Sequence, residues 1–237
     1  TIALIVAVKA LNITGEVITT PFSFVATAHS LLWNNVTPVF VDIDPTSLNM
    51  DPTKIESAIT SQTTGILPVH VYGHPCDVDE IEKIATKNKL KVIYDAAHSF
   101  GVNCHCGSIL NHGDLSVVSF HATKVFNTFE GGAIISKNRE IKLHIDHLKN
   151  FGFVDEITLD QTGINGKMSE FNAALGLVQL KYIDKIINKR KVISDHYESQ
   201  LAKIEGISCI SSTGEMKSNY SYFPILVKNS FPISRDD

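Results

Sequence analysis

The feature that most constrains the fold is an alternation of short, continuously apolar segments with segments of helical character. The apolar segments, which we expect to form strands, occupy residues 16–20, 38–43, 66–71, 91–94, 115–120 and 133–136. Strands that are apolar on both faces must be covered on both sides, and helices between successive strands provide that cover. The sequence therefore predicts an α/β fold with a mostly parallel central sheet.

Helices are expected at residues 2–11, 24–33, 52–59 and 77 to about 88. Asp51 and Asp77 precede two of them at positions where a side chain caps the first turn, and Glu80 completes a capping box with Asp77. Further on, apolar residues recur at helical spacing from Met168 to Leu201, which predicts one long helix with room for a bend. We interpret its apolar face as a core or interface stripe.

Composition excludes several classes of function. Hydrophobic residues make up 43% of the chain and charged residues 19%, which is typical of a folded globular protein. The net charge of −4 leaves no basic footprint for nucleic acid. No apolar run approaches the roughly 20 residues of a membrane span. The four cysteines are few and irregularly spaced, and no signal peptide is visible, so we expect a reducing, cytoplasmic location.

Both ends of the chain bear on its organisation. The sequence starts at Thr1 directly in a helix-like segment, and it stops soon after a strand-like segment at 222–227. Residues 206–219, rich in Ser, Gly and Lys, have the composition of a linker. We therefore expect the chain to be a fragment of a larger protein.

Ligands of open parallel sheets bind beyond the carboxyl ends of the strands. This rule selects Asp95, which follows the apolar segment KVIY. Asp95 could cap the turn that begins at Ala96. It could instead be a buried carboxylate that faces a cationic ligand, for which a protonated pyridine nitrogen is well suited. The strand pattern leaves both interpretations open.

The same rule selects the segment SFHATKVFNTFEGG, which contains Lys124. An amine in such an apolar, glycine-rich loop is desolvated, which lowers its pKa and makes it a nucleophile for carbonyl carbon. A plain surface lysine is the alternative. Ser119 and Thr123 offer hydroxyl donors for a phosphate. His121 either lines this site or packs the loop.

Two other possibilities are weak. Cys104-His105-Cys106 is most simply a variable loop, because no second ligand pair at suitable spacing supports a metal site, and we expect no metal. An NAD enzyme would need a G-x-G-x-x-G turn after a strand, and the sequence has none.

Asp95 and Lys124 belong to a longer series of motifs whose order and spacing are specific. These are EVITTPFSFVATAHS (16–30), PVFVDIDPTSLNMDPTKIESAI (38–59), ILPVHVYGHPCDVDEI (66–81), IYDAAHSFG (93–101), GDLSVVSFHATKVFNTFEGGAI (113–134) and GINGKMSEFNAALGLVQL (163–180). In them the chain resembles the DegT/DnrJ/EryC1/StrS family of pyridoxal 5′-phosphate-dependent sugar aminotransferases. The resemblance implies the aspartate aminotransferase (type I) fold. Residues 1–180 would form the large cofactor-binding domain without its N-terminal part, and residues 181–237 a linking helix and the start of a truncated small C-terminal domain.

The resemblance also implies roles for single residues. Lys124 would hold the aldehyde of pyridoxal 5′-phosphate and then move a proton between Cα and C4′. Asp95 would pair with the pyridinium nitrogen, and His98 would lie near the ring and its O3′. Further contacts would come from four residues: Phe24 stacked on the ring, Ser119 and Thr1 at the phosphate, and Asn165 at the phosphate of the neighbouring subunit's cofactor. His121 would line the substrate side.

The implied reaction transfers an amino group from L-glutamate to a dTDP-linked 4-keto-6-deoxyhexose. The product would be a dTDP-4-amino-4,6-dideoxy sugar for surface polysaccharide such as the O-antigen of lipopolysaccharide. A homodimer with shared sites is expected, without nucleic acid or membrane partners. The same chemistry at C3 of a 3-keto sugar and a catalytically silent regulator or partner subunit remain as alternatives. A sugar dehydratase is disfavoured, because in that branch a histidine replaces the lysine at 124.

Overall fold

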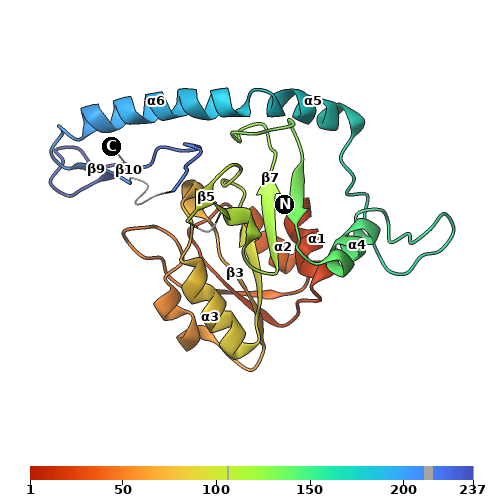
Figure 1. Ribbon diagram of the computed structural model, residues 1–237. Helices are drawn as coiled ribbons and strands as arrows, with labels where there is room; N and C mark the ends of the chain where they lie inside the picture. The colour runs from red at the N-terminus through yellow and green to blue at the C-terminus, as the bar shows by residue number, and fades with distance from the viewer. Residues whose placement is uncertain (106, 211–215, 237) are drawn as a thin grey trace.

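A six-stranded sheet forms the centre of the computed structural model, which describes residues 1–105, 107–210 and 216–236. Its order is β2-β1-β3-β4-β7-β8 (Figure 1). The strands are β1 (Glu16–Thr19), β2 (Thr37–Phe40), β3 (Thr63–Leu67), β4 (Lys91–Asp95), β7 (Leu115–Ser119) and β8 (Gly132–Ile135). All neighbours pair in parallel except β7 and β8. The predicted α/β class with a mostly parallel sheet is therefore confirmed.

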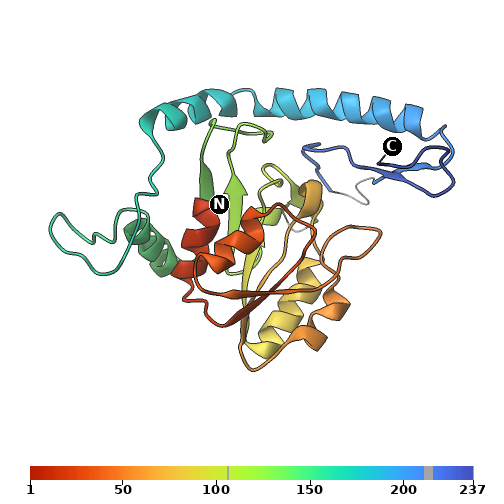
Figure 2. The same cartoon turned by 180° about the vertical axis from the view of Figure 1, so that it is seen from behind.

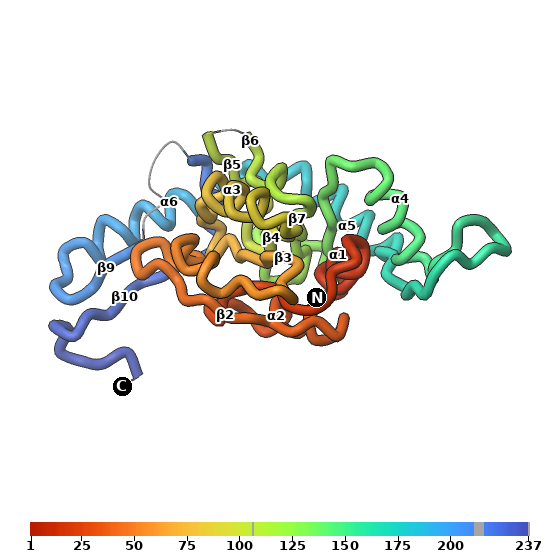
Figure 3. Tube along the Cα trace, turned by 90° about the horizontal axis from the view of Figure 1, so that it is seen from below, coloured from red at the N-terminus to blue at the C-terminus, as the bar shows by residue number. Residues whose placement is uncertain are grey.

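Helices cover both faces of this sheet. One face carries α1 (Ile2–Ala10), α2 (Ala26–Leu32) and α4 (Arg139–Leu148), and the other carries α3 (Val78–Asn88). Figure 3 shows α3 and α1 on opposite sides of β3 and β4. Along β4, Ile93 joins the core under α1, whereas Val92 and Tyr94 join the core under α3. This alternation explains why the strand is apolar along its whole length.

The predicted long helix, for which the sequence left room for a bend, is two consecutive helices in the structure. The structure has α5 (Glu170–Leu180) and α6 (Ile183–Leu201), separated at Tyr182, whose φ of −115° lies outside the helical range. The two helices cross above the sheet and are prominent in Figures 1 and 2. Their apolar stripe is largely exposed within this chain, so it does not belong to this chain's core.

Small elements complete the fold. β9 (Ile207–Cys209) pairs with β10 (Ile225–Val227), and β5 (Asn103–Cys104) pairs with β6 (Gly107–Ser108), both antiparallel. The predicted linker at 206–219 begins with β9 instead of irregular chain, and its residues 211–215 lie outside the described residues. The last predicted strand starts at Ile225 and not at Tyr222.

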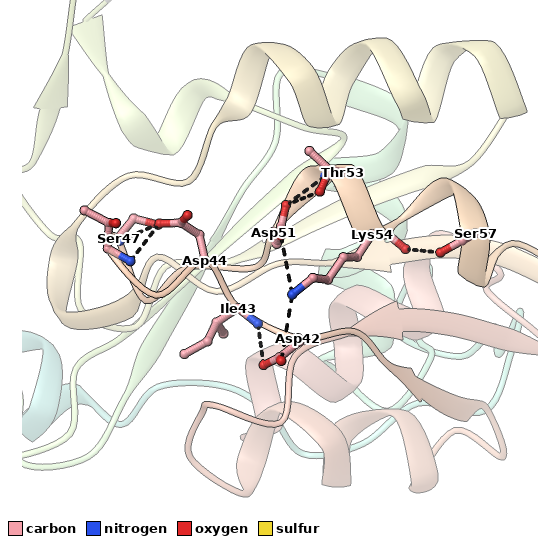
Figure 4. A network of polar contacts seen from close by, with 9 residues as sticks. Asp42, Ile43, Asp44, Ser47, Asp51, Thr53, Lys54 and Ser57 are labelled. Atoms are coloured by element: carbon pink, nitrogen blue, oxygen red, sulfur yellow. Dashed lines mark hydrogen bonds and ion pairs between the residues drawn. The ribbon is translucent and has the colours of Figure 1, made fainter.

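The region after β2 also departs from the prediction. Residues 52–59 form two short 3₁₀ helices, η1 (Pro52–Lys54) and η2 (Glu56–Ala58), and not one α-helix. Asp51 caps the first as expected, accepting a hydrogen bond from the Thr53 amide at 3.0 Å. Figure 4 shows Lys54 between Asp51 and Asp42, with its Nζ 3.5 and 3.8 Å from their carboxylates. These partly exposed ion pairs contribute little stability but hold the loop to the sheet edge.

Two further differences concern element ends. Strand β3 starts at Thr63 and ends at Leu67. It ends there because Pro68 has no amide to continue the ladder. Two more 3₁₀ helices follow later in the chain, η3 (Val71–Gly73) and η4 (Ile109–Asn111). Helix α4 was not predicted. Among the described residues, no helix is both long enough and apolar enough to cross a bilayer.

Candidate active site

The residues selected from the sequence gather at the carboxyl edge of the sheet. Strands β1, β4 and β7 end there at Thr19, Asp95 and Ser119. Figure 1 shows α5 and α6 crossing above this edge, and the chain's first residue lies near β7. Helix α1 packs against the same strands and begins with the exposed Thr1.

Asp95 is a buried carboxylate that two donors hold in place. The Thr27 hydroxyl donates to its Oδ2 at 2.7 Å, and the Ala97 amide donates to its Oδ1 at 3.1 Å. The Ala97 bond is the turn-capping contact that one interpretation of the sequence predicts. Burial raises the pKa of Asp95, although these hydrogen bonds and the charge of Lys124 act in the opposite direction. A cationic partner nearby would stabilise the ionised form of such a buried carboxylate.

His98 is held as a neutral imidazole. Its Nδ1 accepts a hydrogen bond from the Tyr72 amide at 3.2 Å, so the ring proton is assigned to Nε2. Burial, together with the nearby charge of Lys124, lowers the pKa of His98 to about 4. The ring is parallel to that of Tyr72 at 6.4 Å between centroids. His98 therefore presents an Nε2–H donor at neutral pH.

Aromatic packing joins the loop that follows β4 to the loop that carries Lys124. Phe100, from the first loop, stacks on Phe126 with 4.4 Å between ring centroids. Phe120 packs edge-on against Phe126 at 4.8 Å. The backbone amide of Lys124 donates to the His121 carbonyl at 2.9 Å, and the Lys124 side chain is half-buried. The aromatic cluster thus packs the loop that follows Asp95 against the loop that carries Lys124.

The other predicted site residues make fewer contacts with Asp95, His98 and Lys124. Ser119 ends β7 half-buried, and its Oγ accepts from the His121 amide at 3.3 Å. His121 is exposed, with Nδ1 3.0 Å from the Thr123 hydroxyl. Phe24 precedes α2 and is 74% exposed.

Asn165 lies apart from this group. It is exposed in the loop between α4 and α5, where it forms an isolated bridge with Asn150. That loop reaches out to the side of the molecule in Figures 1 and 2. The structure therefore brings Asp95, His98 and Lys124 together and leaves Asn165 outside the same cluster.

Sequence reasoning did not select several residues that surround the site. Thr27, Tyr72, Asn219 and Tyr222 all contact Asp95 or His98 directly, yet they come from separate segments. Thr27 lies in the first turn of α2, and nothing in that turn indicates its buried partner Asp95.

Of the Cys104-His105-Cys106 segment, Cys104 ends β5, and its Sγ lies 3.6 Å from His112 Nε2. Cys106 lies outside the described residues. In the part of the chain that the structure describes, no group of three or more His, Cys, Asp or Glu side chains could hold a metal ion.

Comparison with known proteins decides the family. The model of the DegT/DnrJ/EryC1/StrS aminotransferase family matches residues 1–237. The chain belongs to this family. Among its relatives, the dTDP-4-amino-4,6-dideoxy-D-glucose transaminases of Shigella dysenteriae and Escherichia coli are 60% and 55% identical to it. Each is matched over 100% of the chain, which spans 65% and 64% of their lengths.

Solved structures of sugar aminotransferases share the fold. DesI in the presence of its TDP-sugar product superimposes with a TM-score of 0.90 at 35% identity, covering 95% of this chain and 57% of that one. The ntda protein of Bacillus subtilis, with bound cofactor PMP, gives 0.88 at 34% identity, covering 95% and 53%. The expected aminotransferase fold is confirmed, as is the family resemblance.

The residues of this family member fit a phosphorylated pyridine aldehyde. An ionised carboxylate can accept about four hydrogen bonds, and Thr27 and Ala97 supply two of those at Asp95. A protonated ring nitrogen would add a donor and a compensating charge. The Nε2–H of His98 suits a ring oxygen, and the amine of Lys124 suits an aldehyde. The site thus offers partners for the ring nitrogen, the ring oxygen and the aldehyde, from the two segments that follow the neighbouring strands β4 and β7.

Proposed function

We propose that the protein containing this chain is a nucleotide-sugar aminotransferase that uses pyridoxal 5′-phosphate. It transfers an amino group from L-glutamate to a dTDP-linked 4-keto-6-deoxyhexose and yields a dTDP-4-amino-4,6-dideoxy sugar. The observation that carries this proposal is the joint placement of buried Asp95, neutral His98 and half-buried Lys124 at the carboxyl edge of the sheet. The names of the two relatives at 60% and 55% identity support the choice of sugar and of C4.

Lys124 has the covalent and proton-transfer role. Its amine would hold the aldehyde of the cofactor and, once released, would carry the proton taken from the substrate's Cα. When bound, pyridoxal phosphate would supply the electron sink that stabilises negative charge at the substrate carbon. Asp95 would keep the ring nitrogen protonated with its carboxylate. His98 would donate from Nε2 to the ring oxygen O3′.

Further residues near the carboxyl edge of the sheet are assigned to binding the cofactor and the substrate. We assign Ser119 and Thr1 to the phosphate, which the amino end of α1 also favours. Phe24, exposed in this chain, stacks on the ring, and His121 lines the substrate side. Asn165, apart from the cluster, reaches the phosphate in the neighbouring subunit.

The last assignment requires a second copy, so we propose a homodimer with shared active sites. Residues 1–180 are the large domain, and residues 181–237 are the linking helix and the start of the small domain. The product supplies an amino sugar for surface polysaccharide such as the O-antigen of lipopolysaccharide, made in the cytoplasm. A silent regulatory subunit is not favoured, since Asp95, His98 and Lys124 are all present.

The test uses the full-length protein and its visible spectrum. With pyridoxal phosphate we expect a cofactor band that L-glutamate bleaches and dTDP-4-keto-6-deoxyglucose restores. Bleaching that only the 3-keto isomer reverses would move the reaction to C3. Absence of any cofactor band would refute the aminotransferase assignment.

Lys124→Ala is the first variant, with Lys137→Ala as the exposed control. We expect Lys124→Ala to lose covalent attachment of the cofactor after borohydride reduction. Turnover should fall by about 10³-fold or more, because both nucleophile and proton carrier are lost. The Lys137 variant should retain both properties. Normal turnover in Lys124→Ala would contradict the role given to this lysine.

A further inference from the structure

The segment at 216–222, which follows α6 in the chain, is bound to the loop that carries His98. Asn219 is buried, and its Nδ2 donates to the carbonyl of His98 at 2.7 Å and to that of Phe100 at 2.9 Å. Its Oδ1 accepts from the Ser221 amide at 3.0 Å. One amide side chain therefore closes a turn in its own segment and fastens that turn to the active-site loop.

A second element holds the same turn from the opposite side. Arg190 of α6 donates from Nη1 to the carbonyls of Tyr220 and Ser221, both at 3.3 Å. Tyr220 has a φ of +52°, in the left-handed region that non-glycine residues rarely adopt. Local backbone strain of this kind persists only where surrounding contacts fix the conformation. The contacts of Asn219 and Arg190 fix the conformation of Tyr220 in this turn.

The consequence of the turn is the position of Tyr222. Its ring centroid lies 4.6 Å from that of His98 and 5.6 Å from that of Tyr72. The Nζ of Lys124 lies over the same ring, 5.9 Å from its centroid. Tyr222 is 40% exposed, so it borders the site and is not part of the core.

We propose that Tyr222 is a positioning residue of the active site, holding the Lys124 amine over its ring face, and that Asn219 is the anchor that places it there. The inference rests on the proposed function for its meaning in catalysis. The contact itself is a property of the chain without ligand. Nothing in the local sequence around Tyr222 suggests this role.

A cation within about 6 Å of an aromatic face is attracted by the negative potential of the ring. This attraction holds the Nζ of Lys124 towards the ring of Tyr222 and so limits the directions in which the flexible side chain can point. Lys124 belongs to the loop after β7, whereas Tyr222 comes from a separate segment late in the chain. Tyr222 therefore orients the amine from outside the loop that carries it.

The experiment measures the NMR signal of the Lys124 ε-methylene group in the full-length protein, stripped of cofactor and labelled with ¹³C at the lysine ε-carbons. The resonance is assigned by its loss in Lys124→Arg. We expect Tyr222→Leu, which has no π face, to remove the upfield ring-current displacement of this resonance. Tyr222→Phe keeps the ring and should keep the displacement. Asn219→Ala, confirmed as folded by circular dichroism, should resemble Tyr222→Leu.

Tyr220→Leu is the matched control, because the Tyr220 ring has a different lysine, Lys191, with its Nζ at the same 5.9 Å. It should leave the Lys124 resonance unchanged. An unchanged resonance in Tyr222→Leu, or an equal change in Tyr222→Phe, would overturn the ring's role. A wild-type resonance in Asn219→Ala would overturn the anchor. Failure of borohydride to attach pyridoxal phosphate to Lys124 would refute the proposed function separately, since the NMR measurement needs no cofactor.

Discussion

Two histidines, one half-buried and one fully buried, show how strongly single residues depend on their surroundings. Desolvation keeps the ring of His98 neutral, and its Nδ1 accepts a hydrogen bond from the Tyr72 amide. His70, fully buried beside Asp95, accepts from the Cys76 amide at 3.0 Å and stacks on Tyr94 at 4.7 Å. In the described part of the chain its Nε2 has no hydrogen-bond partner. Burial, and to a lesser extent His112, lowers the pKa of His70 to about 3.

His70 should therefore limit stability in acid. The unfolded chain protonates this histidine near pH 6.5, whereas the folded protein does so only near pH 3. Between those values the unfolded state binds more protons, so the free energy of unfolding falls as the pH falls, by roughly 3–5 kcal/mol in full. His70→Asn can keep an acceptor for the Cys76 amide, and we expect a flatter acid limb in urea unfolding between pH 6.5 and 4. The exposed His196→Asn serves as control, and an equally steep limb in His70→Asn would contradict the assignment.

The sequence predicts part of the site at this scale. Asp95 and Lys124 follow buried strands, so the rule for parallel sheets selects them, and the family resemblance adds His98. Thr27 and Asn219 lie 68 and 121 residues from their partners Asp95 and His98. Their contacts form only in the folded chain, and no local pattern identifies them. Tyr222 belongs to the same class.

At the scale of elements, helix α5 approaches the Lys124 loop unusually closely. Gly176 is the one residue of α5 that is buried in this chain. A Cβ at that position would lie 3.0 Å from Thr128 Cγ2 and 3.5 Å from Phe126 Cζ. The Asn172 amide also donates to the Thr128 carbonyl. The absence of a side chain at 176 thus permits α5 to seat on the loop that positions Lys124.

A larger side chain at 176 should separate the two elements. We expect Gly176→Leu to lower the free energy of unfolding by about 1–3 kcal/mol through overpacking, measured by urea titration of the full-length protein. It should also weaken cofactor binding, since Phe126 is displaced. Ala174→Leu, at an exposed position of α5, is the control. Unaltered stability in Gly176→Leu would show that the loop accommodates the side chain.

Element boundaries were predicted unevenly for physical reasons. Strand β4 and helix α3 have strong local signals, an apolar run and the Asp77 cap, which accepts from the Glu80 amide at 3.1 Å. The break at Tyr182 has no such signal, because both α5 and α6 continue the same apolar periodicity. Helix α4 is capped by Asn138, whose Oδ1 accepts from the Glu140 and Ile141 amides. An Asn at this position is a common helix cap, so the start of α4 does have a local signal in the sequence.

For the whole molecule, the main feature is the apolar stripe on α5 and α6. Phe171 is 90% exposed, and Leu177, Val178, Val192 and Ile193 are also exposed. The sequence predicts a core or interface stripe here, and the structure shows that it is not this chain's core. Exposed apolar surface of this extent is typical of an interaction site. It is therefore the surface that we connect with the proposed homodimer.

Phe171→Asp tests that connection. We expect the full-length protein to have the mass of a dimer in light scattering after gel filtration. Phe171→Asp should shift it towards the monomer, because a charge would be buried without a partner. Ile233→Asp changes another exposed apolar residue, 57% exposed and near the end of the chain, and should leave the mass unchanged. A monomeric wild type would refute the homodimer, and a dimeric Phe171→Asp would place the interface elsewhere.

The aromatic cluster of Phe100, Phe120 and Phe126 has a consequence for protein engineering. Asp95 ends β4, which pairs directly with β7, whereas the rings join the two loops beyond these strands. Changing the bulk of Phe126 would therefore move the Lys124 loop relative to a carboxylate that the sheet holds fixed, while leaving both chemical groups intact. A set of graded substitutions there would act as a ruler for how precisely the loop that carries the amine must be seated.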